Sequence, residues 1–189
     1  MKKLMMSLIA GSAVLTLFAQ VRHSEPQIPV RPTLEEEGSF SMILIPDPQS
    51  QIKFAANQPL FELQTAWIAR EIDSLRILTA LCTGDLVEQN ETAIPLAFRK
   101  TDQTSAEQWR AASRAFERLD NKLPYVVCTG NHDYGYRKAE NSRTCFPDYF
   151  PFERNPAWRD VCVATYPNRN GAISLENADF AFDDPAWGS

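Results

Sequence analysis

Three short apolar runs, each followed directly by a polar loop, constrain the fold of this chain more than any other feature. The runs cover residues 42–45, 77–82 and 125–128. Continuous runs of this length are typical of strands that are buried on both faces of a parallel sheet. Helical segments separate them, which gives the order β-α-β-α-β with right-handed crossover connections. The sequence therefore predicts an α/β fold built on a parallel sheet.

Two amphipathic helices are expected between these strands. Residues 59–75 and the segment that follows Thr104 both carry apolar side chains at helical spacing, while charged residues such as Glu71 are expected to be exposed. Thr104 and Glu107 fit a capping box that starts the second helix. The two apolar stripes, which we interpret as core packing, comprise Phe61, Ile68, Ile72 and Leu75, and then Trp109, Ala112, Phe116 and Leu119.

Polar side chains with oxygen or imidazole groups follow all three strands. They are Asp47 and Gln49 after the first strand, Asp85 after the second, and Asn131, His132 and Asp133 after the third. In open α/β sheets the loops at the carboxyl ends of the strands meet and bind ligands. Carboxylate and amide oxygens are typical ligands of hard divalent cations. The pattern therefore predicts a metal site at this edge of the sheet.

A simpler interpretation exists for each loop taken alone. Asp and Asn after a strand are common turn formers, because their side chains bond nearby backbone groups. His132 could equally be a surface histidine with its hydrogen bonds satisfied. The order and the shared setting of the three loops favour the metal site over this interpretation.

The three loops read Asp47-Pro48-Gln49, Gly84-Asp85 and Gly130-Asn131-His132-Asp133. This pattern resembles the calcineurin-like metallophosphoesterases, which carry Asp-x-His, Gly-Asp and Gly-Asn-His-Asp/Glu in that order after successive strands. The resemblance covers residues 41–133. It implies one β-α-β-α-β half of a sandwich of two sheets flanked by helices. It also implies hydrolysis of a small phosphate ester, either a phosphomonoester or a phosphodiester, with two divalent ions of manganese, iron, zinc or magnesium.

The resemblance assigns a role to each residue of the candidate site. Four side chains would hold the two metals. Asp47 and Gln49 would bind the first metal, Asn131 would bind the second, and Asp85 would bridge both. Metal pairs of this kind clamp phosphoryl oxygens and activate water. His132 would face the substrate and stabilise charge or protonate the leaving oxygen. Asp133 would orient His132.

Two departures from the family pattern bear on activity. Gln49 stands where most of the family has His, and no histidine follows His132. We therefore expect a member that lacks the C-terminal part of the metal site and is impaired as an enzyme. The alternative is a non-catalytic relative that keeps the fold without a complete site. The late carboxylates Asp179, Asp183 and Asp184 are interpreted as a solvated end rather than as replacement ligands.

The N-terminus predicts export. Residues 1–20 combine Lys2 and Lys3 with a short apolar run and are typical of a signal peptide, with an uncleaved membrane anchor as the alternative. Residues 21–38 are a Pro-rich linker, and 39–189 form the domain. We expect a periplasmic or secreted protein without a stable membrane anchor. The formal net charge of −5 provides no general attraction for nucleic acid. The oligomeric state is left open.

The cysteines and the C-terminal third give weaker signals. Cys82 and Cys128 end apolar runs and are expected to be buried. Cys145 and Cys162 could form a disulfide or remain free thiols, and the sequence does not decide between the two. Residues 172–175 predict a fourth strand. Three basic residues lie between the third strand and residues 172–175, and they could touch phosphate or belong to a solvated loop: Arg137, Lys138 and Arg143.

Overall fold

The computed structural model describes residues 31–95 and 101–183. The chain divides into two units, Met1–Arg31 and Pro32–Ser189, and every element described below belongs to the second. The predicted signal peptide, the first part of the predicted linker and Asp184 lie outside the described residues. Within the described ranges, no helix is both long enough and apolar enough to cross a membrane.

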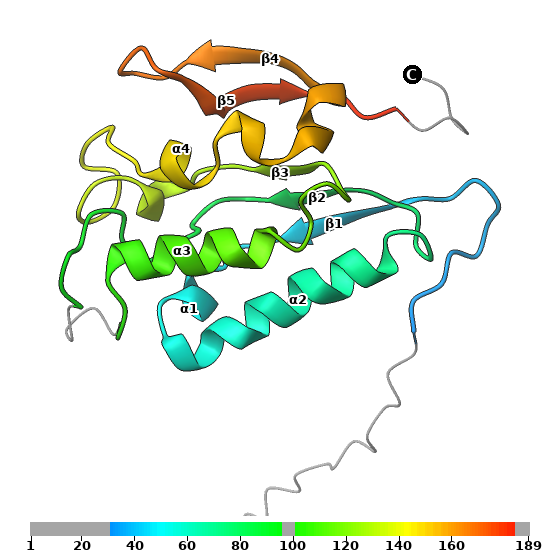
Figure 1. Ribbon diagram of the computed structural model, residues 1–189, viewed down its shortest axis with the longest axis horizontal. Coiled ribbons are helices and arrows are strands. Elements are labelled where there is room, and N and C mark those ends of the chain that lie inside the picture. Colours follow the sequence, from blue (N-terminus) through cyan, green and yellow to red (C-terminus); the bar gives the residue numbers. More distant parts are fainter. Residues whose placement is uncertain (1–30, 96–100, 184–189) are drawn as a thin grey trace, which may run out of the picture. The chain divides into compact units, whose positions relative to one another are not determined.

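Three parallel strands form the main sheet (Figure 1). They are β1 (Ser41–Ile45), β2 (Ile77–Cys82) and β3 (Tyr125–Val127), and their order in the sheet is their order in the chain. Ile45 aligns with Cys82, and Cys82 aligns with Val127, so the three carboxyl ends lie at the same edge. The prediction of an α/β fold with parallel strands in β-α-β-α-β order is confirmed.

Helices α2 (Gln58–Glu71) and α3 (Ser105–Phe116) pack on one face of this sheet. Crossovers of one hand between sequential neighbouring strands place both helices on the same side. On that side the rings of Phe116 and Tyr125 have centroids 5.0 Å apart. The predicted capping box starts α3, because Thr104 accepts a hydrogen bond from the Glu107 amide while the Glu107 carboxylate accepts one from the Thr104 amide.

The predicted apolar stripes form the core, with one error among the charged residues. Seven of the eight stripe residues are buried, and Ile72 is partly buried against them. Glu71, which was expected to be exposed, is 1% exposed. Its carboxylate accepts hydrogen bonds from Arg70 Nε at 2.8 Å and Ser74 Oγ at 2.6 Å. These bonds replace the water that burial removes.

The C-terminal third forms short helices and a hairpin rather than a single extra strand. The hairpin pairs β4 (Cys162–Pro167) with β5 (Ile173–Phe180) in antiparallel fashion. The strand predicted at 172–175 is therefore real but longer, and its partner β4 was missed. Short helical segments precede the hairpin: α4 (Phe146–Tyr149), η4 (Phe152–Arg154) and η5 (Pro156–Asp160).

Arg154 and Trp158 join this third to the α/β core. Arg154 donates to Asp120 at 3.0 Å and to the carbonyl oxygens of Ser113 and Tyr149 at 2.6 and 2.8 Å. The indole of Trp158 donates to the backbone oxygen of Tyr125 at 2.6 Å. The segment that contains these two residues is thus attached to α3 and β3 by polar contacts.

The second face of the main sheet is open at β1, whereas Thr79 of β2, which aligns with Met42, is fully buried. Met42 and Leu44 point away from the helices and are 52% and 64% exposed. Across the same face, Leu81 and Val126 are half-buried. The expectation of strands buried on both faces is therefore wrong for β1, which is one of the two edge strands of this sheet in the described part of the chain.

Candidate functional site

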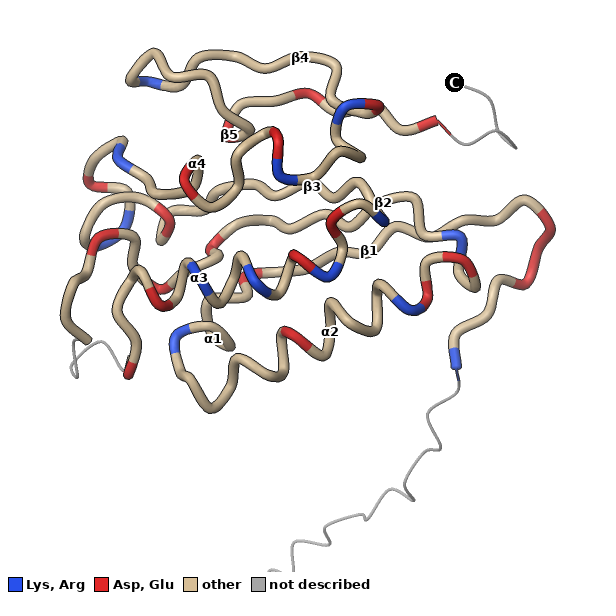
Figure 2. The backbone as a smooth tube through the Cα atoms, viewed as in Figure 1, with Lys and Arg blue, Asp and Glu red and all other residues tan. Residues whose placement is uncertain are grey.

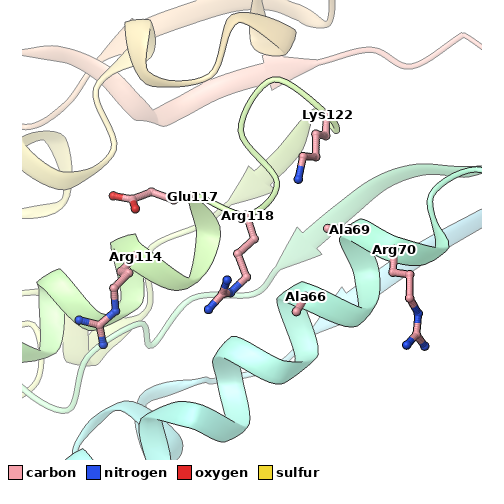
Figure 3. Close-up of a pocket in the computed structure, with 7 residues that line it drawn as sticks. All are labelled: Ala66, Ala69, Arg70, Arg114, Glu117, Arg118 and Lys122. Carbon is pink, nitrogen blue, oxygen red and sulfur yellow. The ribbon is translucent and has the colours of Figure 1, made fainter.

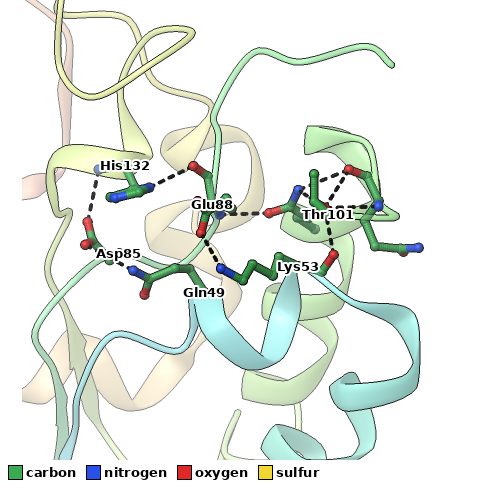
Figure 4. A network of polar contacts seen from close by, with 8 residues as sticks. Gln49, Lys53, Asp85, Glu88, Thr101 and His132 are labelled. Atoms are coloured by element: carbon green, nitrogen blue, oxygen red, sulfur yellow. Dashed lines mark hydrogen bonds and ion pairs between the residues drawn. The ribbon is translucent and has the colours of Figure 1, made fainter. Parts of the chain in front are cut away.

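Asp85 joins the three predicted loops at the carboxyl edge of the sheet. Its Oδ1 accepts a hydrogen bond from the backbone amide of His132 at 3.0 Å. Its Oδ2 lies 3.4 Å from Gln49 Nε2, and its backbone oxygen accepts from the Gln49 amide at 2.9 Å. The loops after β1, β2 and β3 therefore meet at one carboxylate, as the order of the motifs predicted (Figure 4).

Two glycines allow this close approach of the loops. A side-chain carbon on Gly84 would lie 2.4 Å from the Gly130 nitrogen. One on Gly130 would lie 2.1 Å from Asp85 Oδ1. Gly84 also has a φ of +107°, a backbone angle that residues with a side chain rarely adopt. The Gly-Asp and Gly-Asn-His-Asp sequences thus need glycine because each loop fills the space where the other's side chain would be.

The two candidate aspartate ligands share an unusual backbone conformation. Asp47 has a φ of 37° and Asp85 a φ of 50°. A non-glycine residue in this left-handed region is disfavoured by about 1–2 kcal/mol, although Asp tolerates it better than most. Such conformations concentrate at functional sites, where surrounding structure holds them. Asp47 is exposed and Asp85 is partly exposed, so both carboxylates are accessible to solvent.

The His132 ring is buried and fixed by one hydrogen bond. Its Nδ1 lies 2.8 Å from the backbone oxygen of Glu88, and the residue is 8% exposed. A carbonyl oxygen can only accept, so Nδ1 carries a proton. In the neutral imidazole Nε2 is therefore the acceptor, and in the charged form it is a second donor. His132 thus offers Nε2 for proton transfer.

Asp133 does not have the role that the resemblance assigned to it. The prediction that it orients His132 is wrong, because the Glu88 carbonyl oxygen binds the imidazole instead. Asp133 accepts from the backbone amides of Gly130 and Val87 at 2.8 and 3.1 Å and is fully buried. Burial raises the pKa of its carboxyl to about 7, against the lowering effect of these two hydrogen bonds. Asp133 is therefore a structural link between the loops after β2 and β3.

Lys53 and Glu88 belong to the same network, and neither was predicted as a site residue. Lys53 Nζ lies 3.1 Å from Glu88 Oε2. Lys53 follows α1 (Gln49–Ile52), the short helix that also carries Gln49, while Glu88 supplies the carbonyl oxygen that binds His132. Figure 4 shows this ion pair between the Gln49 and His132 sides of the network.

The oxygen donors present fit a hard divalent cation better than a pair of zinc ions. Within the described residues, no three His, Cys, Asp or Glu side chains come together as a metal-binding group. The candidate donors predicted from the sequence are instead two carboxylates, Asp47 and Asp85, and two amides, Gln49 and Asn131, of which Gln49 and Asp85 are in contact. Turning the Gln49 amide over would aim its oxygen where its nitrogen now lies. Magnesium and manganese accept such oxygen donors and complete their coordination with water.

Other candidates from the sequence lie outside this network. Arg143 pairs with Glu91 at 3.1 Å, and the backbone amides of Arg137 and Lys138 bind Glu140. Asp179 is exposed and accepts a hydrogen bond from Tyr166 at 2.8 Å. These contacts agree with solvated loops and give no support for phosphate contacts or replacement ligands.

The four cysteines are all free thiols, so the structure contains no Cys145–Cys162 bridge. Cys82 is buried as predicted, and burial raises the pKa of its thiol to about 12. Cys128 is exposed, which contradicts the prediction that it is buried. It follows the last residue of β3, where the chain turns toward the site.

A second group of charged side chains lies between α2 and α3 (Figure 3). Basic residues recur along α3 (Figure 2). A hollow of about 650 Å³ is lined by four basic residues, of which Arg70 lies on α2, Arg114 lies on α3, and Arg118 and Lys122 follow α3. Glu62 accepts from Arg114 Nε at 2.9 Å and from Arg118 Nη2 at 2.7 Å. Ion pairing with Glu62 accounts for Arg114 and Arg118, and Arg70 pairs with Glu71 at 2.8 Å.

Comparison with known proteins adds no relative. No protein-family model matches the chain, and no curated protein matches it.

Proposed function

We propose that this chain is a metal-dependent phosphoesterase of the calcineurin-like type that hydrolyses a small phosphate ester after export. One observation carries the proposal. The Asp85 carboxylate is hydrogen-bonded between the loop that bears Gln49 and the loop that bears His132, while Asp47 and Asp85 both have left-handed backbones. Ordinary turns do not need a carboxylate at the meeting point of three loops, whereas a ligand site does.

The exposed apolar residues of β1 support the proposal that the main sheet belongs to a sandwich of two sheets. In a sandwich of two sheets, a second sheet packs on the face opposite the helices. Met42 and Leu44 supply apolar surface on that face. In this proposal the main sheet with α2 and α3 would be one half of such a sandwich, as the resemblance implies.

The residues have separable roles in this proposal. Asp47, Gln49, Asp85 and Asn131 would hold the metal through oxygen atoms. A bound divalent cation would polarise a phosphoryl oxygen and lower the pKa of a coordinated water. His132, fixed through Nδ1, would use the proton on Nε2 to neutralise the leaving oxygen. Asp133 would keep the loops in register without touching the substrate.

A non-catalytic relative is the second candidate function. The observation that favours it is the donor set, because the described residues contain no group of three His, Cys, Asp or Glu side chains that could hold a metal. Fewer charged donors and imidazoles mean lower metal affinity. The metal content of the purified protein separates the two: bound divalent ions support the enzyme, and their absence after loading supports the relative.

Hydrolysis of a chromogenic phosphate mono- or diester with added Mn²⁺ tests the proposal. Asp85→Asn keeps the size of the side chain but removes its charge, so it should abolish Mn²⁺ binding and turnover together. His132→Gln should retain Mn²⁺ binding and lower kcat by about 10²-fold or more. Asp73→Asn, at an exposed position outside the network, is the matched control. Wild-type hydrolysis that survives Asp85→Asn unchanged would falsify the proposed site.

A further inference from the structure

The Lys53–Glu88 ion pair has no role in the function proposed above, yet it lies inside the candidate site (Figure 4). The two side chains are 21% and 16% exposed, so solvent and a small ligand can reach them. We propose that Lys53 binds the phosphoryl group of the substrate and that Glu88 holds the lysine in place before the substrate arrives. This inference rests on the proposed function.

The backbone places Lys53 on the metal side of the site. Its amide donates to the Gln49 oxygen at 2.9 Å, so the two residues lie one helical turn apart on the same side of α1. Its own carbonyl oxygen accepts from Thr101 Oγ1 at 2.7 Å. The lysine backbone is therefore fixed at both of its polar atoms, and the flexible side chain can still turn.

Glu88 connects the lysine to the imidazole. Its backbone amide donates to Gln108 Oε1 at 2.7 Å, and its carbonyl oxygen binds His132 Nδ1 at 2.8 Å. Its carboxylate binds Lys53 at 3.1 Å. One residue thus fixes His132 through its main chain and Lys53 through its side chain, which sets the spacing between the two groups.

Charge explains why a phosphate ester would use this lysine. Asp47, Asp85 and Glu88 are carboxylates, and a phosphate group that approaches them is repelled unless cations offset their charge. Within the described residues His132 is the one histidine, so further positive charge must come from lysine, arginine or a bound cation. A lysine ammonium has three donors, so it can bind a phosphoryl oxygen without fully releasing Glu88.

Binding of inorganic phosphate to the Mg²⁺-loaded full chain tests the proposal by calorimetry, at low ionic strength. Lys53→Gln should weaken phosphate binding by about tenfold or more, which corresponds to the loss of one charge-assisted hydrogen bond. Lys53→Arg should restore most of it. Glu88→Gln keeps the carbonyl oxygen that binds His132 and a side-chain oxygen that can still accept from Lys53, but it removes the competing negative charge, so it should tighten phosphate binding. Lys122→Gln, in the hollow between α2 and α3, is the control and should change nothing.

A merely structural ion pair gives a different result. Lys53→Gln and Glu88→Gln would then both lower the unfolding midpoint while the phosphate Kd stayed the same, and that outcome overturns the proposal. Failure of wild type to bind phosphate also overturns it. The proposed function is judged separately by ester hydrolysis. If phosphate binding needs Lys53 but no ester is hydrolysed, this inference stands and the proposed enzyme is rejected. If Lys53→Gln hydrolyses the ester with an unchanged KM, the proposed enzyme stands and this inference is rejected.

Discussion

Replacing Gly84 by alanine is the sharpest perturbation of the loop junction. A Cβ there would lie 2.4 Å from the Gly130 nitrogen and 2.7 Å from the Thr129 carbonyl carbon, and both atoms belong to the backbone. The φ of +107° adds a second cost. Alanine in a left-handed conformation loses about 1–2 kcal/mol, and overpacking against atoms that cannot rotate away adds about 1–3 kcal/mol. We expect Gly84→Ala to lower the free energy of unfolding by about 2–5 kcal/mol.

Gly171 provides the matched control for this prediction. It also has a positive φ, +79°, but a Cβ there would meet nothing within 4 Å. Gly171→Ala should therefore lose only the conformational part, about 1–2 kcal/mol. Gly130→Ala isolates the steric part, because its φ of −101° is ordinary while its Cβ would lie 2.1 Å from Asp85 Oδ1.

Equilibrium unfolding in urea measures all three variants, and Mn²⁺ titration of the folded protein adds a second readout. Gly84→Ala should be the least stable. Gly130→Ala should show the clearest loss of Mn²⁺ affinity, because it displaces the Asp85 carboxylate. If Gly84→Ala and Gly171→Ala lower the free energy of unfolding equally, with the same dependence on urea concentration, the argument that the loops meet this closely is refuted.

Three further predictions concern stability. Thr104→Ala should cost about 1 kcal/mol in urea unfolding because α3 loses its N-cap, whereas Thr104→Ser should be nearly neutral, and equal effects would argue against the cap. Partial burial raises the pKa of Glu62, but hydrogen bonds from Arg114 and Arg118 outweigh it and lower the pKa, so this carboxylate stabilises the fold above about pH 4.5 and the benefit is lost as the pH falls through its folded pKa. The stability difference between wild type and Glu62→Gln should therefore shrink below about pH 4.5 and in high salt, and a pH-independent difference would contradict it. Arg154→Met should destabilise by about 3 kcal/mol or more in thermal or urea unfolding, since it removes the cation paired with the Asp120 carboxylate and the guanidinium donors to the Ser113 and Tyr149 carbonyl oxygens, and a loss below about 1 kcal/mol would refute the buried link.

The main sheet could be predicted because each of its strands appears in the sequence as a continuous apolar run. The observed bounds of β1 and β2, Ser41–Ile45 and Ile77–Cys82, match the sequence pattern closely, and the capping box at Thr104 fixed the start of α3. The hairpin gave no comparable signal. Most of β4 and β5 is exposed or half-buried, so their residues lack both an apolar run and a clean alternation. Glu71 was misjudged because its partners are a neighbouring arginine and serine that charge patterning does not reveal.

The candidate site could be predicted only as far as side chains carry its chemistry. The meeting of Gln49, Asp85 and His132 follows from parallel strands with aligned ends. The partner of the imidazole is a backbone oxygen, and a carbonyl has no signature in the sequence, so Glu88 could not be recognised. For the same reason Asp133 was assigned to His132, although its carboxylate oxygens accept hydrogen bonds from two backbone amides.

The open face of the main sheet bears on how the protein behaves when it is crowded. Met42 and Leu44 project from an edge strand, so exposed apolar side chains and an unpaired strand backbone occur at the same place in the described part of the chain. Edges of this kind are templates for strand addition, and the residues of β1 include no charged side chain to prevent it. Self-association should therefore begin at β1 and rise with protein concentration. We therefore expect the five residues of β1 to limit the solubility of this protein.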